Sequence, residues 1–242
     1  MVVLRALAFN AAFWIVSIIM AVGWLPSLLL PRRFAVAGMR KWAALMLEFL
    51  RTIVGVKMEI RGVHHRIDGP VLYAIKHQSM WDTIVPYVVF SDPVIVLKKE
   101  LALLPIYGWY AKKAGMIPVD RSAGASALRK MVQAAKKVRD EGRPILIFPE
   151  GTRSAPGSPP DYKPGVAALY SQLDVPCIPV AVNSGLVWGR RSFIKKPGTI
   201  TLEFLPAIEP GLKRKAFMAE LESRIEKATH DLVAEQQPLQ NG

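Results

Sequence analysis

Cysteine is almost absent from this chain of 242 residues, which contains only Cys177. A lone cysteine excludes a disulfide within the chain and any zinc site built from cysteine pairs. The histidines also lack the spacing of metal ligands, because His64 and His65 are adjacent while His77 and His230 are isolated. We therefore expect no metal site. The cysteine content suits a reducing compartment such as the cytosol.

Several familiar motifs are missing as well. The chain has no G-x-G-x-x-G fingerprint for a dinucleotide and no P-loop for a nucleoside triphosphate. Residues 124–128 approach the G-x-S-x-G elbow of hydrolases but lack its second glycine. These absences argue against dinucleotide-binding proteins, nucleoside triphosphatases and α/β-hydrolases.

Acidic residues are scarce relative to basic ones. The chain carries 32 lysines and arginines against 19 aspartates and glutamates, a net charge of +13. The first 60 residues hold seven basic and two acidic residues, whereas the last 31 hold five of each. A basic face attracts phospholipid headgroups, nucleic acid or a phosphorylated substrate. Nucleic acid is disfavoured, because the basic residues are not interleaved with aromatic side chains on a strand platform.

The amino-terminal part contains a long apolar run. Residues 6–30 carry no charge, and these 25 residues suffice to cross a bilayer core of about 30 Å. The run exceeds the apolar region of a usual signal peptide, and no small-x-small cleavage site follows it. A second apolar stretch, 34–54, is punctuated by Arg40, Lys41 and Arg51 and predicts a basic amphipathic helix.

Three arrangements of these two helices remain open. The first is a spanning helix followed by a surface helix, the second is a two-helix hairpin lying in one leaflet, and the third is a pair of core helices in a soluble fold. If the first helix spans, the positive residues after the run put the rest of the chain on the cytoplasmic side. A hairpin gives the same side if the protein was never translocated. We assign residues 1–55 to membrane-anchoring helices and residues 56–242 to a separate domain.

From residue 56 onwards the sequence alternates between strand and helix patterns. We expect strands at 56–60, 71–75, 93–97, 116–119, 144–148, 177–182 and 199–205. Helices are expected at 79–90, 100–113, 125–139, 166–172 and 217–235. This alternation predicts an α/β fold whose sheet is covered by helices on both faces.

His77 and Asp82 form the most informative pair in the sequence. They lie five residues apart, directly after the apolar strand 71–75. On a regular helix this spacing separates two side chains by about 140°, so the pair meets only where the chain bends from a strand into a helix. An imidazole held by a carboxylate is a candidate general base. The alternative is that Ser79 and Asp82 form a helix-capping box and that His77 is an incidental loop residue.

Three further clusters lie in or directly after predicted strands. They are Arg121 at the end of 115–121, the run Glu150, Gly151, Thr152 and Arg153 after 144–148, and the segment 175–180 with Pro176 and Pro179. Loops at the carboxyl ends of strands are the usual place for a site in an α/β sheet. Arginine side chains suit a phosphate, and a glycine lets the backbone approach a ligand closely.

Taken together, the four clusters resemble the glycerolipid acyltransferase family, specifically its bacterial 1-acylglycerol-3-phosphate acyltransferases. The family's ordered blocks match H-x4-D at 77–82, G-x-I-x-x-D-R at 115–121, E-G-T-R at 150–153 and V-P-x-x-P-V at 175–180. The order and spacing of the blocks agree across residues 55–210.

The resemblance implies transfer of a fatty acyl group from a thioester to the sn-2 hydroxyl of lysophosphatidic acid, giving phosphatidic acid. It makes His77 the general base and Asp82 the residue that orients its imidazole. It also implies that Arg121, Glu150, Gly151, Thr152 and Arg153 hold the glycerol phosphate, and that Pro176 and Pro179 shape a substrate pocket.

The same resemblance implies the partners and the location of the protein. The acyl donor would be acyl-CoA or acyl carrier protein, with no cofactor and no metal. The other partners would be lysophosphatidic acid and the phospholipid bilayer. The domain would lie on the cytoplasmic face of the bacterial inner membrane.

One position departs from the family pattern, because Lys76 stands where members often carry asparagine before the motif histidine. The identity of the acceptor therefore stays open. The alternative is an enzyme of the same fold whose acceptor is another lyso-phospholipid, a lyso-aminolipid or glycerol 3-phosphate. A different class of alternative is a non-catalytic membrane protein that sequesters anionic lipid. Ser79 is a further candidate as a nucleophile, but its position favours a helix cap. Cys177 is a candidate acyl carrier, but its apolar strand favours a buried core position.

Overall fold

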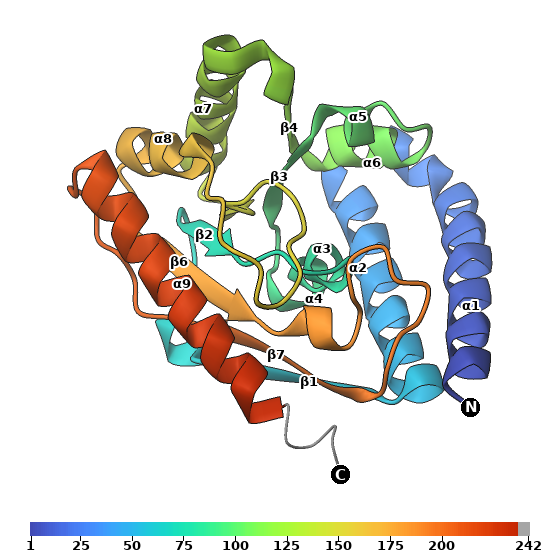
Figure 1. Cartoon of the computed structure of the whole chain (residues 1–242). Helices are drawn as coiled ribbons and strands as arrows, with labels where there is room; N and C mark the ends of the chain where they lie inside the picture. The colour runs from blue at the N-terminus through green and yellow to red at the C-terminus, as the bar shows by residue number, and fades with distance from the viewer. Residues whose placement is uncertain (237–242) are drawn as a thin grey trace.

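The computed structural model describes residues 1–236, which form a seven-stranded sheet with helices on both faces (Figure 1). The strands are β1 (Val56–Arg61), β2 (Leu72–Ile75), β3 (Val94–Lys98), β4 (Ile117–Val119), β5 (Ile145–Ile147), β6 (Cys177–Val182) and β7 (Gly198–Phe204). The helices are α1 (Val2–Gly23), α2 (Arg32–Phe49), α3 (Trp81–Ile84), α4 (Pro86–Val89), α5 (Lys99–Ala102), α6 (Tyr107–Ala114), α7 (Gly124–Asp140), α8 (Pro164–Leu173) and α9 (Arg214–Gln236). The predicted α/β fold with a covered sheet is confirmed.

The sheet is mostly parallel, in the order β1-β7-β6-β2-β5-β3-β4. The pair β6 and β7 is antiparallel, whereas the other neighbouring strands are parallel. β1 and β7 therefore run opposite to the remaining strands. The carboxyl ends of β2, β4, β5 and β6 consequently lie along one edge of the sheet, where α/β proteins commonly bind ligands.

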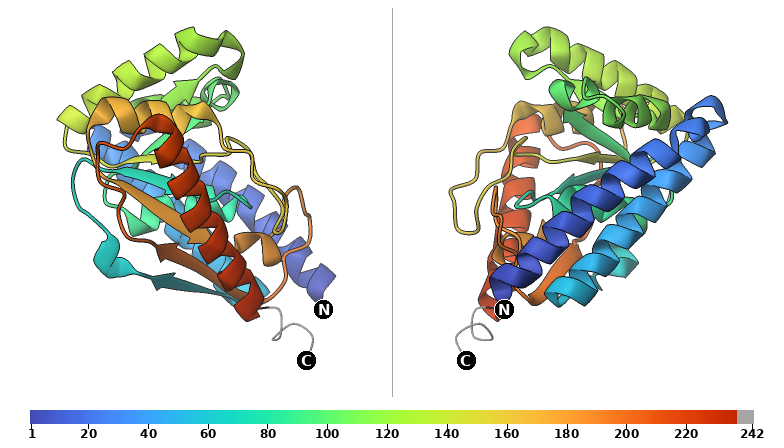
Figure 2. Two further views of the ribbon diagram at one scale, coloured as in Figure 1. Left: turned by 60° about the vertical axis from the view of Figure 1, so that its left-hand side comes forward. Right: turned by 90° about the vertical axis from the view of Figure 1, so that its right-hand side faces the viewer.

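Each face of the sheet carries its own hydrophobic core. In β2, Tyr73 and Ile75 point into the core shared with the amino-terminal helices, α3 and α4. Leu72 and Ala74 point into the opposite core, which is filled from α7, α8 and α9. Figure 2 shows these helices as layers on either side of the strands. Burial on both faces explains why β2, β5 and β6 read as continuous apolar runs rather than alternating ones.

The first two helices form a hairpin against one face of the sheet (Figure 2, right). Gly38 of α2 lies so close to Trp24 that an added Cβ would come within 2.4 Å of the indole, so a larger residue would push the helices apart. The indole nitrogen of Trp42 donates a hydrogen bond to Ser17 Oγ at 2.9 Å. The inner face of α2 joins the sheet's own core through residues such as Met46.

The outer face of α1 is apolar and exposed. Leu4, Trp14, Ile15, Ile18 and Ile19 each expose between 58% and 66% of their surface. Among residues 1–236, α1 is also the helix that is long and apolar enough to cross a membrane. α1 is therefore not a buried core helix, which argues against the third of the arrangements considered above.

Two of the predicted helices are each divided into two short ones. The segment 79–90 forms α3 and α4, because Pro86 has no backbone N–H to continue the first helix. The segment 100–113 is interrupted before α6 by Pro105, and Ile106 takes a positive φ of 62°. A proline disfavours helical geometry in the residue before it, which explains the second break.

Candidate active site

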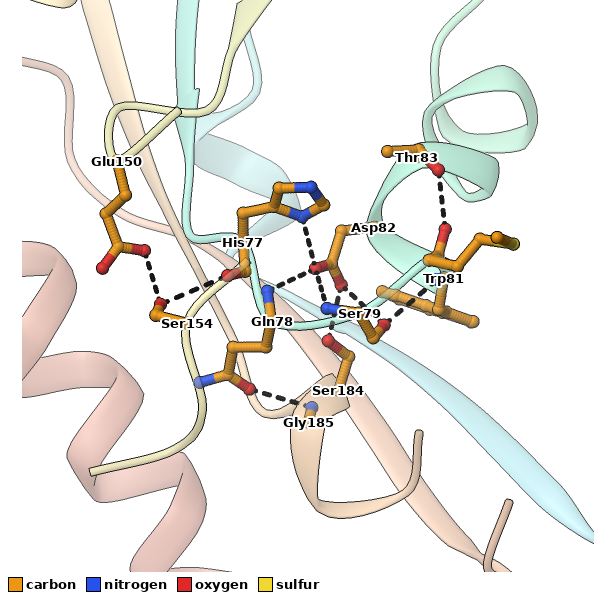
Figure 3. A network of polar contacts seen from close by, with 11 residues as sticks. His77, Gln78, Ser79, Trp81, Asp82, Thr83, Glu150, Ser154, Ser184 and Gly185 are labelled. Atoms are coloured by element: carbon orange, nitrogen blue, oxygen red, sulfur yellow. Dashed lines mark hydrogen bonds and ion pairs between the residues drawn. The ribbon is translucent and has the colours of Figure 1, made fainter. Parts of the chain in front are cut away.

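The turn after β2 brings His77 and Asp82 together. Nδ1 of His77 lies 3.0 Å from Oδ2 of Asp82 (Figure 3). The same carboxylate oxygen accepts the backbone N–H groups of Gln78 at 2.7 Å and Ser79 at 2.8 Å. Ser79 Oγ accepts the N–H of Trp81 at 3.0 Å. Capping contacts and the His–Asp contact thus occur in one turn, so the two interpretations of this segment are compatible.

Asp82 is enclosed completely. Its exposure is 0%, and Oδ1 accepts a hydrogen bond from Ser184 Oγ at 2.5 Å. Ser184 follows β6 and is 102 residues from Asp82 in the sequence (Figure 3). With both oxygens engaged inside the protein, Asp82 is placed to hold the histidine and not to meet a substrate.

The imidazole of His77 is held in a defined orientation. It stacks on Phe148 with ring centroids 4.1 Å apart and an interplanar angle of 22°, and His77 is 8% exposed. An ionised carboxylate only accepts hydrogen bonds, so a neutral ring carries its proton on Nδ1 and leaves Nε2 as an acceptor. Figure 3 shows the second ring nitrogen on the side away from Asp82. A general base requires this arrangement.

A buried ion-pair network lies directly behind the histidine. Lys76 Nζ donates to Glu150 Oε1 at 3.0 Å and to Glu226 Oε1 of α9 at 2.7 Å. The side chains of Lys76 and Glu150 are each 3% exposed. Ser154 completes the link, because its Oγ donates to Glu150 Oε2 at 2.7 Å and its N–H donates to the His77 carbonyl at 2.9 Å. The network joins the histidine turn to the loop after β5.

We expect Lys76→Met to destabilise the protein, because it leaves two carboxylates facing each other in a buried site. Removing one partner of a buried pair costs about 3–5 kcal/mol. The measurement is the free energy of unfolding of the purified protein in detergent. The double variant Lys76→Met/Glu150→Gln should recover part of the loss, since it removes one of the unpaired charges. Equal losses in the single and the double variant would contradict the assigned pairing.

The loop after β5 carries Gly151 with a φ of +69°, a conformation that favours glycine. Its neighbour in space is Arg121, whose Cζ lies 3.5 Å from the position that a Cβ on Gly151 would occupy. Thr152 is exposed. Arg153 is partly buried, and burial lowers the pKa of its guanidinium, with a smaller opposing effect of Asp82. The structure thus gathers Arg121, Arg153 and the histidine turn at one edge of the sheet.

The turn that carries Arg121 is itself fixed by a carboxylate. Asp120 accepts the N–H and the Oγ of Ser122 at 3.1 and 2.6 Å and pairs with Lys99 at 2.9 Å. These contacts, led by the Ser122 hydroxyl, lower the pKa of Asp120 to about 2. Asp120 therefore acts as a cap of the turn, which leaves the Arg121 side chain exposed at the site's edge.

The two alternative nucleophiles are poorly placed for chemistry. Ser79 has 0% exposure, and its hydroxyl is occupied by the Trp81 N–H and the Asp82 carboxylate. Cys177 is also completely buried in β6, and burial raises the pKa of its thiol. Among residues 1–236 no group of three or more histidines, cysteines and carboxylates is arranged to hold a metal ion.

Comparison with known proteins identifies the family. The sequence model described as Acyltransferase matches residues 57–183, a segment that contains the histidine turn, the arginine-bearing loops and β6. This chain belongs to the acyltransferase family. The matched segment holds the three clusters at the carboxyl edge of the sheet, whereas the fourth, 175–180, begins before β6 and continues within that strand. Pro176 accepts the N–H of Leu72 at the opposite, amino edge, so the structure does not bring this cluster to His77.

Named relatives of this acyltransferase agree with that assignment. It is 32% identical over 201 residues to a 1-acyl-sn-glycerol-3-phosphate acyltransferase of Pseudomonas aeruginosa, covering 83% of this chain and 78% of that protein. A protein of the same name from Limnanthes alba is 31% identical over 64% of this chain and 56% of its own length. The mouse protein named 1-acyl-sn-glycerol-3-phosphate acyltransferase alpha is 31% identical over 58% of this chain and 50% of its own length.

The fold of the acyltransferase also has a solved counterpart. The crystal structure of the 1-acyl-sn-glycerophosphate acyltransferase from Thermotoga maritima superposes with a TM-score of 0.79 at 18% identity. The match covers 96% of this chain and 98% of that chain, so it includes the amino-terminal hairpin.

Several residues around the acyltransferase site escaped the sequence argument. Ser184, Phe148 and Glu226 contact the histidine turn or its supporting network but belong to no motif singled out above. Lys76 was noticed only as a departure from a family pattern. The signal that was available is the lysine itself, directly after an apolar strand, since a lysine buried there needs polar partners from elsewhere in the fold.

Proposed function

We propose that the protein transfers a fatty acyl group from a thioester to the sn-2 hydroxyl of lysophosphatidic acid. The observation that carries the proposal is the His77–Asp82 contact of 3.0 Å, which leaves Nε2 free beside the loop of Arg153. The names of the relatives supply the acceptor. The donor is acyl-CoA or acyl carrier protein, with no cofactor.

In this mechanism Nε2 of His77 takes the proton from the acceptor hydroxyl as its oxygen attacks the thioester carbon. The tetrahedral intermediate then collapses, the carbon–sulfur bond breaks, and the departing thiolate receives the proton from the imidazolium. Asp82 stabilises the imidazolium and fixes the ring. A positioned base contributes about 10²–10⁴-fold to such a step. A thiolate is a good leaving group, so a covalent acyl-enzyme is unnecessary.

Arg121 and Arg153 are proposed to bind the acceptor phosphate, with Gly151 and Thr152 forming the loop that presents them. Guanidinium groups suit phosphate oxygens because they donate parallel hydrogen bonds. Glu150 has a different part in this account. Its carboxylate is occupied by Lys76 and Ser154, so it positions the loop and does not touch the phosphate.

We further propose that the helix hairpin lies in one leaflet of the membrane. α1 contacts the domain near its middle and near its carboxyl end, since Phe193 O accepts from Asn10 Nδ2 at 3.1 Å and the Tyr110 hydroxyl donates to Ala21 O at 3.0 Å. These contacts span about 16 Å of helix, so a spanning α1 would draw the domain into the bilayer core. Leu103 after α5 and Trp109 in α6 are exposed apolar residues as well. The domain then lies on the cytoplasmic face.

Labelling from the two sides of the membrane tests this topology. Cys177 is buried, so a cysteine introduced at the exposed Arg5 is available alone. We expect Arg5→Cys and the matched control His230→Cys on α9 to react with an impermeant maleimide from the same, cytoplasmic side. Reaction of the two cysteines from opposite sides would show that α1 spans the membrane and would sink the hairpin.

An acceptor panel tests the proposed substrate. Purified protein would be supplied with acyl-CoA or acyl carrier protein thioesters and with lysophosphatidic acid, other lyso-phospholipids, a lyso-aminolipid or glycerol 3-phosphate. We expect the fastest transfer to lysophosphatidic acid. If another acceptor is acylated and lysophosphatidic acid is not, the proposed acceptor is wrong. The assignment as an acyltransferase would still stand.

A further inference from the structure

A cavity of about 260 Å³ lies between α1 and the loop after β6. Its lining combines cationic side chains with aromatic ones, among them Arg153, Arg191, Trp14 and Phe193. The loop that closes it is the orange segment that reaches from the sheet towards α1 in Figure 1. The cavity reaches the histidine turn, because Met80 of that turn and Arg153 both line it.

Neither arginine of the cavity forms an ion pair with a described carboxylate. The ion pairs among residues 1–236 involve neither Arg153 nor Arg191. Burial lowers the pKa of the Arg153 guanidinium, Asp82 opposes this effect, and the nearby Arg190 adds a smaller lowering. Two guanidinium groups that face one cavity without a partner are complementary to a dianionic ligand such as a phosphate monoester.

Arg191 occupies its position at a conformational cost. Its φ is +56°, in the left-handed region that glycine favours. The N–H of Ser192 donates to Gly189 O at 3.0 Å, so Arg191 lies inside a tight turn. A glycine would fit this turn without strain, whereas the arginine adds a guanidinium to the cavity wall.

The membrane helix itself builds the opposite wall. Lys195 is 3% exposed, and its Nζ donates to Asn10 Oδ1 of α1 at 2.7 Å and to Phe193 O at 3.1 Å. Asn10 Nδ2 donates to Phe193 O at 3.1 Å. The rings of Phe9 and Phe13 of α1 pack against Trp188, with centroids 5.5 and 6.3 Å apart. These contacts fix the loop 188–195 to α1.

Building on the proposed function, we propose that α1 and the loop 188–195 form the outer wall of the acceptor site. Arg191 is then a further phosphate-binding residue, in addition to Arg121 and Arg153, and the Asn10–Lys195 contact is a positioning element. Trp14, which belongs to the exposed apolar face of α1, also lines this cavity. A lipid can therefore keep its acyl chain in the bilayer while its phosphate enters the cavity, which makes α1 part of the substrate site.

Binding measured without turnover tests this inference. In the full chain carrying His77→Ala, in nonionic detergent, calorimetry would compare lysophosphatidic acid with lysophosphatidylcholine of the same chain length. We expect Arg191→Gln and Arg191→Gly to weaken lysophosphatidic acid binding about 10- to 100-fold, as for loss of a charged hydrogen bond. Arg191→Lys should retain part of the affinity. Arg129→Gln, an exposed arginine on α7, is the matched control and should bind as the parent does.

The role of α1 has its own variant. Asn10→Leu should weaken lysophosphatidic acid binding, whereas Ala11→Leu at the exposed neighbouring position should leave it unchanged. Parental affinity in Arg191→Gly and Asn10→Leu would overturn the inference and leave the proposed function intact. A parent that does not prefer lysophosphatidic acid over lysophosphatidylcholine would instead reject the proposed acceptor, and this inference with it.

Discussion

Replacing His77 with alanine should lower kcat by about 10³-fold or more, because the acceptor hydroxyl then loses its general base. Nε2 of His77 is the ring nitrogen left available by the Asp82 contact, and no other histidine lies in this turn. The measurement is phosphatidic acid formation by the purified variant at saturating lysophosphatidic acid and acyl donor.

The control for this variant is a substitution of a histidine outside the site. His230→Ala on α9 should retain parental activity, since His230 is exposed. Binding of lysophosphatidic acid by His77→Ala should also persist, because the phosphate-binding arginines are untouched. A His77→Ala protein that is folded and keeps parental kcat would contradict the assigned base and favour a merely structural histidine.

Asp82→Asn should have the second largest effect, with kcat lowered by about 10²–10⁴-fold. One carboxylate oxygen of Asp82 faces three groups at once, namely His77 Nδ1 and the N–H groups of Gln78 and Ser79. An amide presents one oxygen and one NH₂ group. If the NH₂ group takes the place of Oδ2, it faces the N–H groups of Gln78 and Ser79. If it takes the place of Oδ1, it faces the Ser184 hydroxyl, which donates to that oxygen in the parent. The imidazole also loses the negative charge that stabilises its protonated form.

A stability measurement separates the two consequences of this substitution. The mismatched buried amide should lower the free energy of unfolding by about 1–3 kcal/mol. The fold-loss in kcat should be larger than the fraction of unfolded protein at the assay temperature accounts for. Asp161→Asn, in the exposed part of the loop 151–164, is the matched control and should change neither quantity. An Asp82→Asn enzyme with parental kcat would exclude Asp82 from orienting the base.

The sequence predicted the parts of the fold that depend on local pattern. Apolar runs bounded by turn residues marked the strands, and the five-residue spacing of His77 and Asp82 required the bend that the structure contains. The strand order and the antiparallel step between β6 and β7 depend on long-range pairing, which one sequence does not encode in any local signal. The break of 79–90 at Pro86 was missed, although a proline inside an expected helix is a local signal for such a break.

The candidate site was predictable only where its residues belong to motifs. His77, Asp82 and Arg153 stand in recognisable blocks, so their gathering at one sheet edge followed from the rule on strand ends. Ser184 and Glu226 reach the site from segments that are 102 and 150 residues away from their partners. Such contacts arise from tertiary packing alone. The same holds for Arg191, whose position depends on how α1 docks against the loop 188–195.

The central claim is that His77 activates the acceptor hydroxyl for direct attack on a thioester. Following thiol release and phosphatidic acid formation together, in one reaction with and without lysophosphatidic acid, tests it most directly. We predict one thiol released per phosphatidic acid formed, release that requires the acceptor, and loss of both signals in His77→Ala. Equal thiol release without the acceptor, or phosphatidic acid formation undiminished in His77→Ala, would contradict the account.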